Sequence, residues 1–345
     1  MREAIGQAPA KVNLVLKVAR PGPDHYHPLL TVFEAVNLWE YVEARTQRAP
    51  GVSVRTLAYR PSVDGVGAPA LDPVATEALA QLPPEQHLAV RAAKVLQPLV
   101  AARWGATAAG LSLTVHKTIP AAGGMAGGSA DAAATLVAVN DLWDLGLGLE
   151  QLEALGRRLG ADVPACLRGN WSVGDDRGDR LLTVSPAPAQ PTHWWALAFF
   201  RVGLSTPAVF RQFDELGLGA EELPSASDYL DRARALTGPA GELGPLLDNE
   251  LQATALSLRP ELAQAGQQAL SLGATAWVVS GSGPTVAALC ASHEEAVRVA
   301  EAWQAEAQWA TSDLLGATVV GGAVGAAQTA AELPVWTETA RSGSL

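Results

Sequence analysis

Alternating hydrophobic and polar positions mark the first part of the chain. From Ala8 to Val18 an apolar side chain occupies every second position, while Lys11, Asn13 and Lys17 fall on the opposite face. A period of two predicts a half-buried strand. Neighbours on one face of a strand are ~7 Å apart, so Lys11 and Asn13 should project side by side. These two polar side chains could belong to a functional site or, equally well, to an ordinary solvated face of the strand. Further strands are expected at residues 30–38, continuing to 44, and at residues 52–57.

The middle of the chain mixes helical and strand-like spacing. Residues 60–84 are rich in Pro, Gly and Ala without periodicity and predict a long surface excursion. A helix is expected from His87 to Val100 and a strand from Leu111 to Lys117. After a glycine-rich loop, Ser129 or Asp131 could cap an apolar helix, and another helix should follow at 149–159, ended by Gly160. Asp162 precedes Val163-Pro164 and could simply be the N-cap of a further helix.

A proline-rich segment at Ser185–Pro191 is the best candidate for a domain boundary. We therefore expect one domain over residues 1–185, a second over residues 186–327, and a loose tail over residues 328–345. In the second domain, strands are expected at 194–202, 274–279, 285–290 and 318–324, and helices from 205, at 229–236, over most of 246–272, and at 292–309.

Composition narrows the class of protein. The 345 residues can bury a large core, and 48% hydrophobic with 17% charged residues describes an ordered globular chain. A net charge of −11 argues against nucleic acid or an acidic membrane surface as the main partner. Cys166 and Cys290 make neither a disulfide framework nor a metal cluster, and the first residues lack the apolar core of a signal peptide. We therefore expect a cytoplasmic protein.

Four glycines fall within the six residues Gly123–Gly128, immediately before an alanine-rich segment. A flexible loop leading into a helix N-terminus offers unpaired N–H groups and partial positive charge, which suit a phosphate group. The loop has the glycine spacing of a Walker A motif, but Ser129 stands where that motif has lysine. A plain loop that needs positive φ at several positions is the simpler alternative.

Together with Pro9-Ala10-Lys11-Val12-Asn13 and Ser280-Gly281-Ser282-Gly283-Pro284, this loop resembles the three motifs of the GHMP kinase superfamily, which includes galactokinase, homoserine kinase and mevalonate kinase. Within it, the chain most resembles the kinases of 4-(cytidine 5′-diphospho)-2-C-methyl-D-erythritol, which act on its 2-hydroxyl in the non-mevalonate isoprenoid pathway. The resemblance extends over about Ala8 to Val324 and includes Asp24-His25-Tyr26-His27 and Leu159-Gly160-Ala161-Asp162-Val163-Pro164.

This resemblance implies a two-domain α/β (α+β) fold, with an N-terminal domain similar to domain 2 of ribosomal protein S5 and a C-terminal ferredoxin-like domain. It implies an ATP-dependent enzyme that is a monomer or homodimer. The substrate would be a small molecule with a cytidine diphosphate group, and Mg²⁺ would be held through the ATP phosphates near Ser129. Asp162 would be the general base and Lys11 would keep it ionised. The substrate would contact Asn13, Tyr26, His27 and Phe210. The residues implied in ATP binding are Lys117, Pro120, Ala121, Ala122, Gly123, Gly124, Met125, Ala126, Gly127, Gly128, Ser129 and Ala130.

The chain departs from the family pattern at three places. His25 stands where glycine is common, His87 stands where asparagine is usual near the adenosine, and the 60–84 excursion is long. Three rival functions stay open: a kinase of another small alcohol such as homoserine, mevalonate or galactose; an inactive nucleotide-binding member; and a serine hydrolase built on Ser282. The last lacks the outer glycines of G-x-S-x-G.

Overall fold

A long sheet runs through the molecule and carries both halves of the chain. The computed structural model describes residues 2–105, 110–121, 123–186 and 192–336. Its strands are β1 (Glu3–Val18), β2 (Leu29–Thr46), β3 (Val52–Arg60), β4 (Ala70–Leu71), β5 (Leu111–Lys117), β6 (Trp171–Asp175), β7 (Arg180–Thr183), β8 (His193–Phe200), β9 (Asp248–Asn249), β10 (Ala276–Val279), β11 (Val286–Cys290), β12 (Leu314–Gly322) and β13 (Gln328–Ala330).

The described helices pack against strands of both halves. They are α1 (Pro73–Ala80), α2 (Leu88–Trp104), α3 (Gly127–Leu142), α4 (Leu149–Arg157), α5 (Val163–Arg168), α6 (Thr206–Glu215), α7 (Ala226–Ala235), α8 (Ala240–Leu243), α9 (Gln252–Leu258), α10 (Glu261–Ser271) and α11 (His293–Ala307). None of them, within the part of the chain that is described, is long and apolar enough to cross a membrane.

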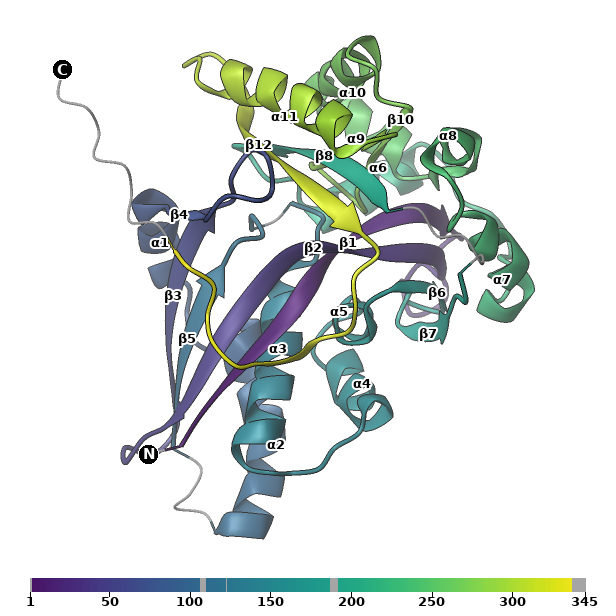
Figure 1. Cartoon of the computed structure of the whole chain (residues 1–345). Helices are drawn as coiled ribbons and strands as arrows, with labels where there is room; N and C mark the ends of the chain where they lie inside the picture. Colours follow the sequence, from purple (N-terminus) through teal and green to yellow (C-terminus); the bar gives the residue numbers. More distant parts are fainter. Residues whose placement is uncertain (1, 106–109, 122, 187–191, 337–345) are drawn as a thin grey trace, which may run out of the picture.

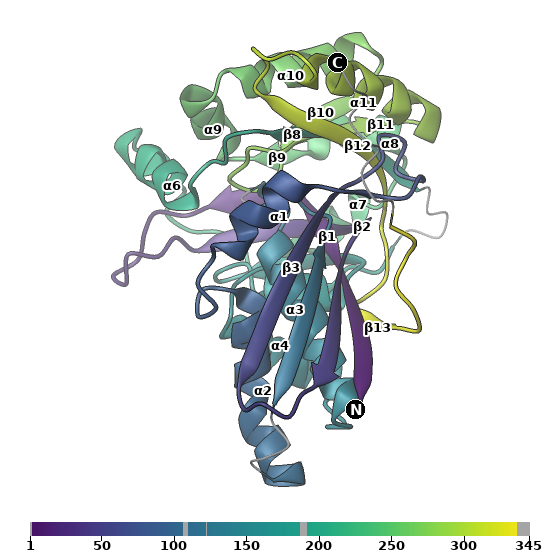
Figure 2. The same cartoon turned by 90° about the vertical axis from the view of Figure 1, so that its left-hand side faces the viewer.

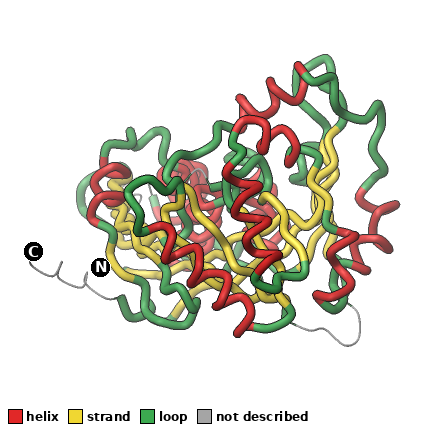
Figure 3. The backbone as a smooth tube through the Cα atoms, turned by 90° about the horizontal axis from the view of Figure 1, so that it is seen from above, coloured by secondary structure: helices red, strands yellow, loops and turns green. Residues whose placement is uncertain are grey.

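Strand pairing joins the two halves at several places, since β1 pairs with β9 and β13 and β2 pairs with β12. The described strands follow the order β10-β11-β8-β12-β2-β5-β3-β4, with β1 and β6 both paired to β2. The link between β12 and β2 is the pairing of Gly322 with Val36. Figure 1 shows the long N-terminal strands below and the green-to-yellow C-terminal elements above them. Seen from above in Figure 3, strands run through both parts with helices beside them.

Burial does not alternate along β1 as expected: Ala8 to Leu16 are buried on both faces, so the prediction of a half-buried strand was wrong there. The first hydrophobic cluster draws on residues from both halves of the chain. In β1, Ala10, Val12 and Leu14 are fully buried and pack with the apolar side of α3. Helices α2 and α3 lie behind the long strands in the view of Figure 2. A second cluster, centred on Trp303 of α11, packs against β8, β11 and β12. The strand predicted at 30–38 is continuous with the segment to residue 44 and forms the single strand β2.

Most of residues 60–84 are exposed or partly exposed, as expected of a surface excursion, but the segment also contains β4 and α1, which the sequence did not predict. Asp72 caps α1: its Oδ1 accepts hydrogen bonds from the N–H groups of Val74 and Ala75, both at 3.1 Å, and Pro73 follows at the first helical position. Asp followed by Pro is a helix-start signal. The helix has only eight residues and none of them is buried, so its sequence shows no apolar face with helical spacing.

The start of α3 also differs from the prediction. The helix begins at Gly127, and its N-cap residue is Ala126 in the left-handed region at φ 63°. Asp131 lies inside the helix and is buried, so it caps nothing. The tail differs as well, since β13 pairs with β1 from Ile5 to Gln7. The loose-tail expectation therefore fails for residues 328–330, and residues 337–345 lie outside the described residues.

Candidate active site

A cavity of about 750 Å³ opens where β1, the glycine-rich loop, the β6–β7 turn, α5 and α6 meet. Motifs that are far apart in the sequence line it together. The predicted site residues in its wall are Lys11, Asn13, Tyr26, His27, Gly123, Gly124, Ala126, Gly127, Gly128, Ser129, Asp162 and Phe210. Gly281 and Ser282 of the third motif line it too.

Some predicted ATP-binding residues are not in the described lining of the cavity. Met125 and Ala130 are buried in the hydrophobic core, where their side chains support the loop from behind. Pro120 and Ala121 lie before the loop and outside the lining, and Ala122 lies outside the described residues. Lys117 is also outside the lining, because its ammonium group binds buried carboxylates instead.

Lys11 is the centre of the polar groups in the cavity. Its Nζ donates to Asn13 Oδ1 at 2.5 Å and to the Gly124 carbonyl at 2.8 Å, and lies 3.8 Å from Asp162 Oδ2. Asn13 in turn donates to Thr31 Oγ1 at 2.9 Å. The predicted juxtaposition of Lys11 and Asn13 is confirmed. The ammonium group is thus held by β1 and the loop at a fixed place beside the Asp162 carboxylate.

Asp162 precedes α5, as a capping residue would, but its side chain acts differently. It has helical backbone angles, φ −82° and ψ −9°, and in the described residues its carboxylate caps no backbone N–H. The side chain is 39% exposed, and the residue forms part of the cavity lining. The carboxylate is therefore available to a molecule bound in the cavity, and helix capping does not account for it.

The glycine-rich loop approaches its neighbours too closely for side chains. Gly124 has φ 77°, and a Cβ there would lie 2.2 Å from the Ser280 carbonyl oxygen. Ser280 Oγ also donates to the Gly124 carbonyl at 3.1 Å, so the third motif holds the loop in place. Only glycine permits both the backbone conformation and this contact.

The first turn of α3 presents unpaired donors to the cavity. The intrahelical bonds begin with Ala130 N–H donating to the Ala126 carbonyl. The N–H groups of Gly127, Gly128 and Ser129 have no acceptor among the described residues, and all three residues line the cavity. Unpaired N–H groups at a helix N-terminus attract anions. This geometry fits a phosphate group.

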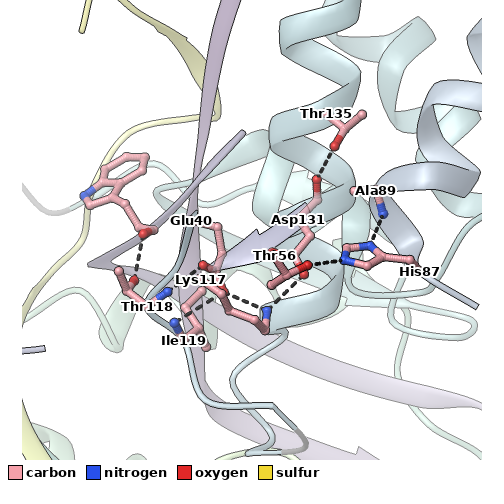
Figure 4. A network of polar contacts seen from close by, with 10 residues as sticks. Glu40, Thr56, His87, Ala89, Lys117, Thr118, Ile119, Asp131 and Thr135 are labelled. Atoms are coloured by element: carbon pink, nitrogen blue, oxygen red, sulfur yellow. Dashed lines mark hydrogen bonds and ion pairs between the residues drawn. The ribbon is translucent and has the colours of Figure 1, made fainter. Parts of the chain in front are cut away.

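A buried ionic cluster supports the loop on its other side, and Figure 4 shows it from close by. Lys117 Nζ donates to Glu40 Oε1 and to Asp131 Oδ2, both at 2.9 Å. Glu40 Oε2 accepts the Thr118 N–H at 2.8 Å, which fixes the chain just before the loop. Asp131 Oδ1 is buried with no hydrogen-bond partner among the described residues.

Burial in this cluster shifts the pKa values of its members. Burial raises the pKa of Glu40 to about 8, although the charge of Lys117 opposes the shift and that of Asp131 adds to it. Burial alone would lower the pKa of Lys117, but the charges of Asp131 and Glu40 outweigh it and raise that pKa. Lys117 therefore stays charged and holds β5 to β2 and α3.

His87, where the family pattern is broken, is structural here. Its Nδ1 accepts the Ala89 N–H at 3.3 Å and caps α2, while Nε2 bonds to Thr56 Oγ1 at 3.0 Å. Burial lowers the pKa of His87, which favours the neutral ring that this acceptor role requires. The described cavity lining does not include it.

The predicted aromatic group comes together at the other end of the cavity. The His27 and Phe210 ring centroids are 4.7 Å apart, and the Tyr26 side chain is 44% exposed at the cavity wall. His27 Nε2 bonds to Asp214 Oδ1 at 2.8 Å. Phe210 and Asp214 are four residues apart on α6, so they share one helix face.

Several lining residues were missed from the sequence. Arg177, Arg211, Thr206 and Asp214 reach the cavity from elements that carry no recognisable motif. The spacing of Phe210 and Asp214 was the one available signal for the α6 face. Ser282 Oγ bonds to Thr206 Oγ1 at 2.8 Å. This contact gives no support to a serine hydrolase, because such an enzyme needs a histidine base beside its serine.

Comparisons with known proteins agree with this arrangement. The family model for the GHMP kinases N terminal domain matches residues 87–170, and that for the GHMP kinases C terminal matches residues 232–308. The 4-diphosphocytidyl-2-C-methyl-D-erythritol kinase of Nocardia farcinica is 43% identical over 296 residues, 85% of this chain and 87% of its own. That of Thermobifida fusca is 43% identical over 325 residues, 91% and 97% of the two chains.

Solved structures show the same fold. A crystal structure of 4-(cytidine 5′-diphospho)-2C-methyl-D-erythritol kinase has a TM-score of 0.65 and 28% identity, and covers 94% of this chain and 100% of its own. Homoserine kinase from Cytophaga hutchinsonii has the same TM-score at 19% identity, covering 96% and 98% of the two chains, which shows the fold alone. The expected mixed α/β fold with an N-terminal and a C-terminal domain is confirmed.

Proposed function

The chain belongs to the 4-diphosphocytidyl-2-C-methyl-D-erythritol kinases of the GHMP kinase family, and from this premise we propose how it works and which residues it uses. It transfers the γ-phosphoryl group of ATP to the 2-hydroxyl of 4-(cytidine 5′-diphospho)-2-C-methyl-D-erythritol, a step of non-mevalonate isoprenoid biosynthesis. We place the ATP-binding domain at residues 1–185 and the second domain at residues 186–327, acting in the cytoplasm as a monomer or homodimer.

One observation carries the assignment of roles. The Lys11–Asp162 pair, the N-terminus of α3 and the aromatic group around His27 line a single cavity. A kinase of the cytidyl substrate needs these three elements together: a general base for the hydroxyl group, donors for the phosphates and a pocket for the cytosine.

Asp162 is the proposed general base. The 2-hydroxyl oxygen forms a bond to the γ-phosphorus while the bond between the γ-phosphorus and the oxygen bridging it to the β-phosphate breaks. ADP leaves, and the hydroxyl proton passes to the Asp162 carboxylate. An alcohol is a weak acid, so the carboxylate helps only when it is placed beside that hydroxyl. Lys11, 3.8 Å away, offsets negative charge on the phosphoryl group.

The donors on α3 and the loop are the proposed triphosphate site. Gly127, Gly128 and Ser129, whose N–H groups have no acceptor among the described residues, line the cavity at the start of a 16-residue helix, whose dipole adds partial positive charge. Mg²⁺ bound with ATP would neutralise part of the phosphate charge. The Ser129 hydroxyl and the Asp162 carboxylate are oxygen donors in the same wall, which suits that ion.

Tyr26, His27 and Phe210 are the proposed cytosine pocket. Stacking on aromatic rings contributes ~1–3 kcal/mol per base. The hydrogen bond between His27 Nε2 and the Asp214 carboxylate fixes the orientation of the His27 ring. The Nδ1 side of the ring can then face the pyrimidine. An alcohol without a nucleobase, such as homoserine or mevalonate, would leave this pocket unused.

A direct assay tests the proposal. The purified full chain is given ATP, Mg²⁺ and, in turn, the cytidyl substrate, homoserine, mevalonate and galactose, and ADP release is followed. We expect the highest kcat/KM with the cytidyl substrate. Faster turnover of any other alcohol would contradict the proposed substrate, and ATP binding without turnover of any of them would point to an inactive member.

A further inference from the structure

The substrate end of the cavity must hold an anion in a protein that repels anions overall. The net charge of the chain is −11, so long-range attraction does not favour a diphosphate. The donors of α3 are at the ATP end. A cytidine diphosphate group therefore needs local cations near the aromatic pocket.

The described lining of the cavity contains three lysine or arginine side chains: Lys11, Arg177 and Arg211. Lys11 is already bonded to Asn13 and to the Gly124 carbonyl and pairs with Asp162. The two arginines remain for the substrate end. The acids of that end are engaged, because Asp214 bonds to His27 and Asp24 pairs with Arg177.

Arg177 is held in place by a tight turn between β6 and β7. The preceding residue, Asp176, has φ 61°, and its carbonyl accepts the Leu29 N–H at 2.7 Å. The Arg177 guanidinium lies over the Tyr26 ring, 4.1 Å from the centroid, and Nη2 donates to Asp24 Oδ2 at 3.3 Å. A guanidinium has five N–H donors, so several remain for a ligand in the cavity.

Arg211 approaches the same cavity from α6, next to Phe210. Its side chain is exposed and forms no ion pair or hydrogen bond with any residue that the structure describes. The helix that carries it also carries Phe210 and Asp214, so its Cα position is tied to the cytosine pocket. The Arg211 guanidinium can therefore bind an anionic group in the cavity.

We propose that Arg177 and Arg211 bind the diphosphate of the cytidyl substrate from two sides of the cavity, an inference that rests on the proposed function. Arginine matches phosphate oxygens with paired N–H donors, and such charge-assisted bonds are stronger than neutral ones. The stacking of Arg177 on Tyr26 also joins the nucleobase pocket to the diphosphate site. The alternative is that Arg177 only positions the Tyr26 ring.

Ligand truncation separates these possibilities. Calorimetric titration of the full chain with cytidine, CMP and CDP is compared for the wild type, Arg177→Met, Arg211→Met and the double variant. We expect each single change to weaken CDP binding by about tenfold while cytidine binding changes by less than about threefold. The double variant should lose the preference for CDP over cytidine. KM for the cytidyl substrate should rise and KM for ATP should not.

Arg180→Met is the matched control, because Arg180 lies in the same hairpin, pairs with Asp176 and is outside the described cavity lining. It should bind CDP as the wild type does. Equal losses for cytidine and CDP in Arg177→Met, or unchanged CDP affinity in both single variants, would overturn the diphosphate site. If CDP binds through the arginines but the wild type does not phosphorylate the cytidyl substrate, the proposed function fails and the diphosphate site stands.

Discussion

Two lysines lie beside the glycine-rich loop, and they differ in how closely they pair with acidic side chains and in how exposed those acidic side chains are. Lys117 donates to Glu40 and Asp131 at 2.9 Å, and the two acid side chains are 0% and 6% exposed. Lys11 lies 3.8 Å from Asp162, whose side chain is 39% exposed. The first cluster is closed to solvent, whereas the second opens into the cavity.

From this difference we infer a structural role for the Lys117 cluster, beside the chemical role proposed above for the Lys11–Asp162 pair. In the Lys117 cluster the charges are buried and bonded to each other, so removing one leaves another uncompensated in a dry environment. In the Lys11–Asp162 pair, Lys11 is fixed by other partners, and among the described residues no hydrogen-bond donor contacts the Asp162 carboxylate. We therefore expect the same kind of substitution to reduce stability in the first cluster and turnover in the second.

Asp162→Asn should give the largest effect. It removes the proposed base without changing the shape of the side chain, so kcat should fall by about 10²–10⁴-fold. ATP should still bind, and the free energy of unfolding should change by less than about 1 kcal/mol, because the side chain caps no described helix N–H. Steady-state kinetics and nucleotide titration measure both. Wild-type turnover in this variant would falsify the assigned base, and Asp144→Asn on the surface is the control.

Lys117→Met should mainly affect stability. The buried side chains of Glu40 and Asp131 lose their cation, and breaking such a cluster destabilises proteins by about 3–5 kcal/mol. Urea unfolding followed by fluorescence measures the loss. Lys94→Met, at an exposed position of α2, should change the free energy of unfolding by less than about 0.5 kcal/mol. If Lys117→Met unfolds like the wild type but loses turnover, the contrast between the two lysines is wrong.

The pH dependence of stability should contain a contribution from the Lys117 cluster. The pKa of Glu40 is about 8 in the folded chain against 4.5 as its ordinary value, so between these values the folded state holds a proton that the unfolded state has released. The free energy of unfolding should then decrease as pH rises from 5 to 8, by up to about 1.4 kcal/mol per pH unit. Glu40→Gln should flatten that slope. Parallel slopes for the two proteins in urea unfolding at several pH values would show that Glu40 does not titrate there.

Local patterns in the sequence determined part of the site. Alternation placed Lys11 and Asn13 on one face of β1, because side chains two residues apart on a strand point the same way. The glycines of the 123–128 loop and the apolar segment after it determined a loop that leads into a buried helix. Both features depend on neighbouring residues, so the chain itself encodes them.

Only the tertiary structure decided which distant residues contact these local features. Lys117, implied in ATP binding, pairs instead with Glu40, which is 77 residues away in the sequence, and Asp131 is a buried acid instead of a cap. Arg177 and Arg211 reach the cavity from a turn and a helix that carry no motif. Such contacts join residues that are remote along the chain, and they follow from how the sheet and helices pack. A periodic pattern records which face of an element is buried, but not which distant side chain lies against it.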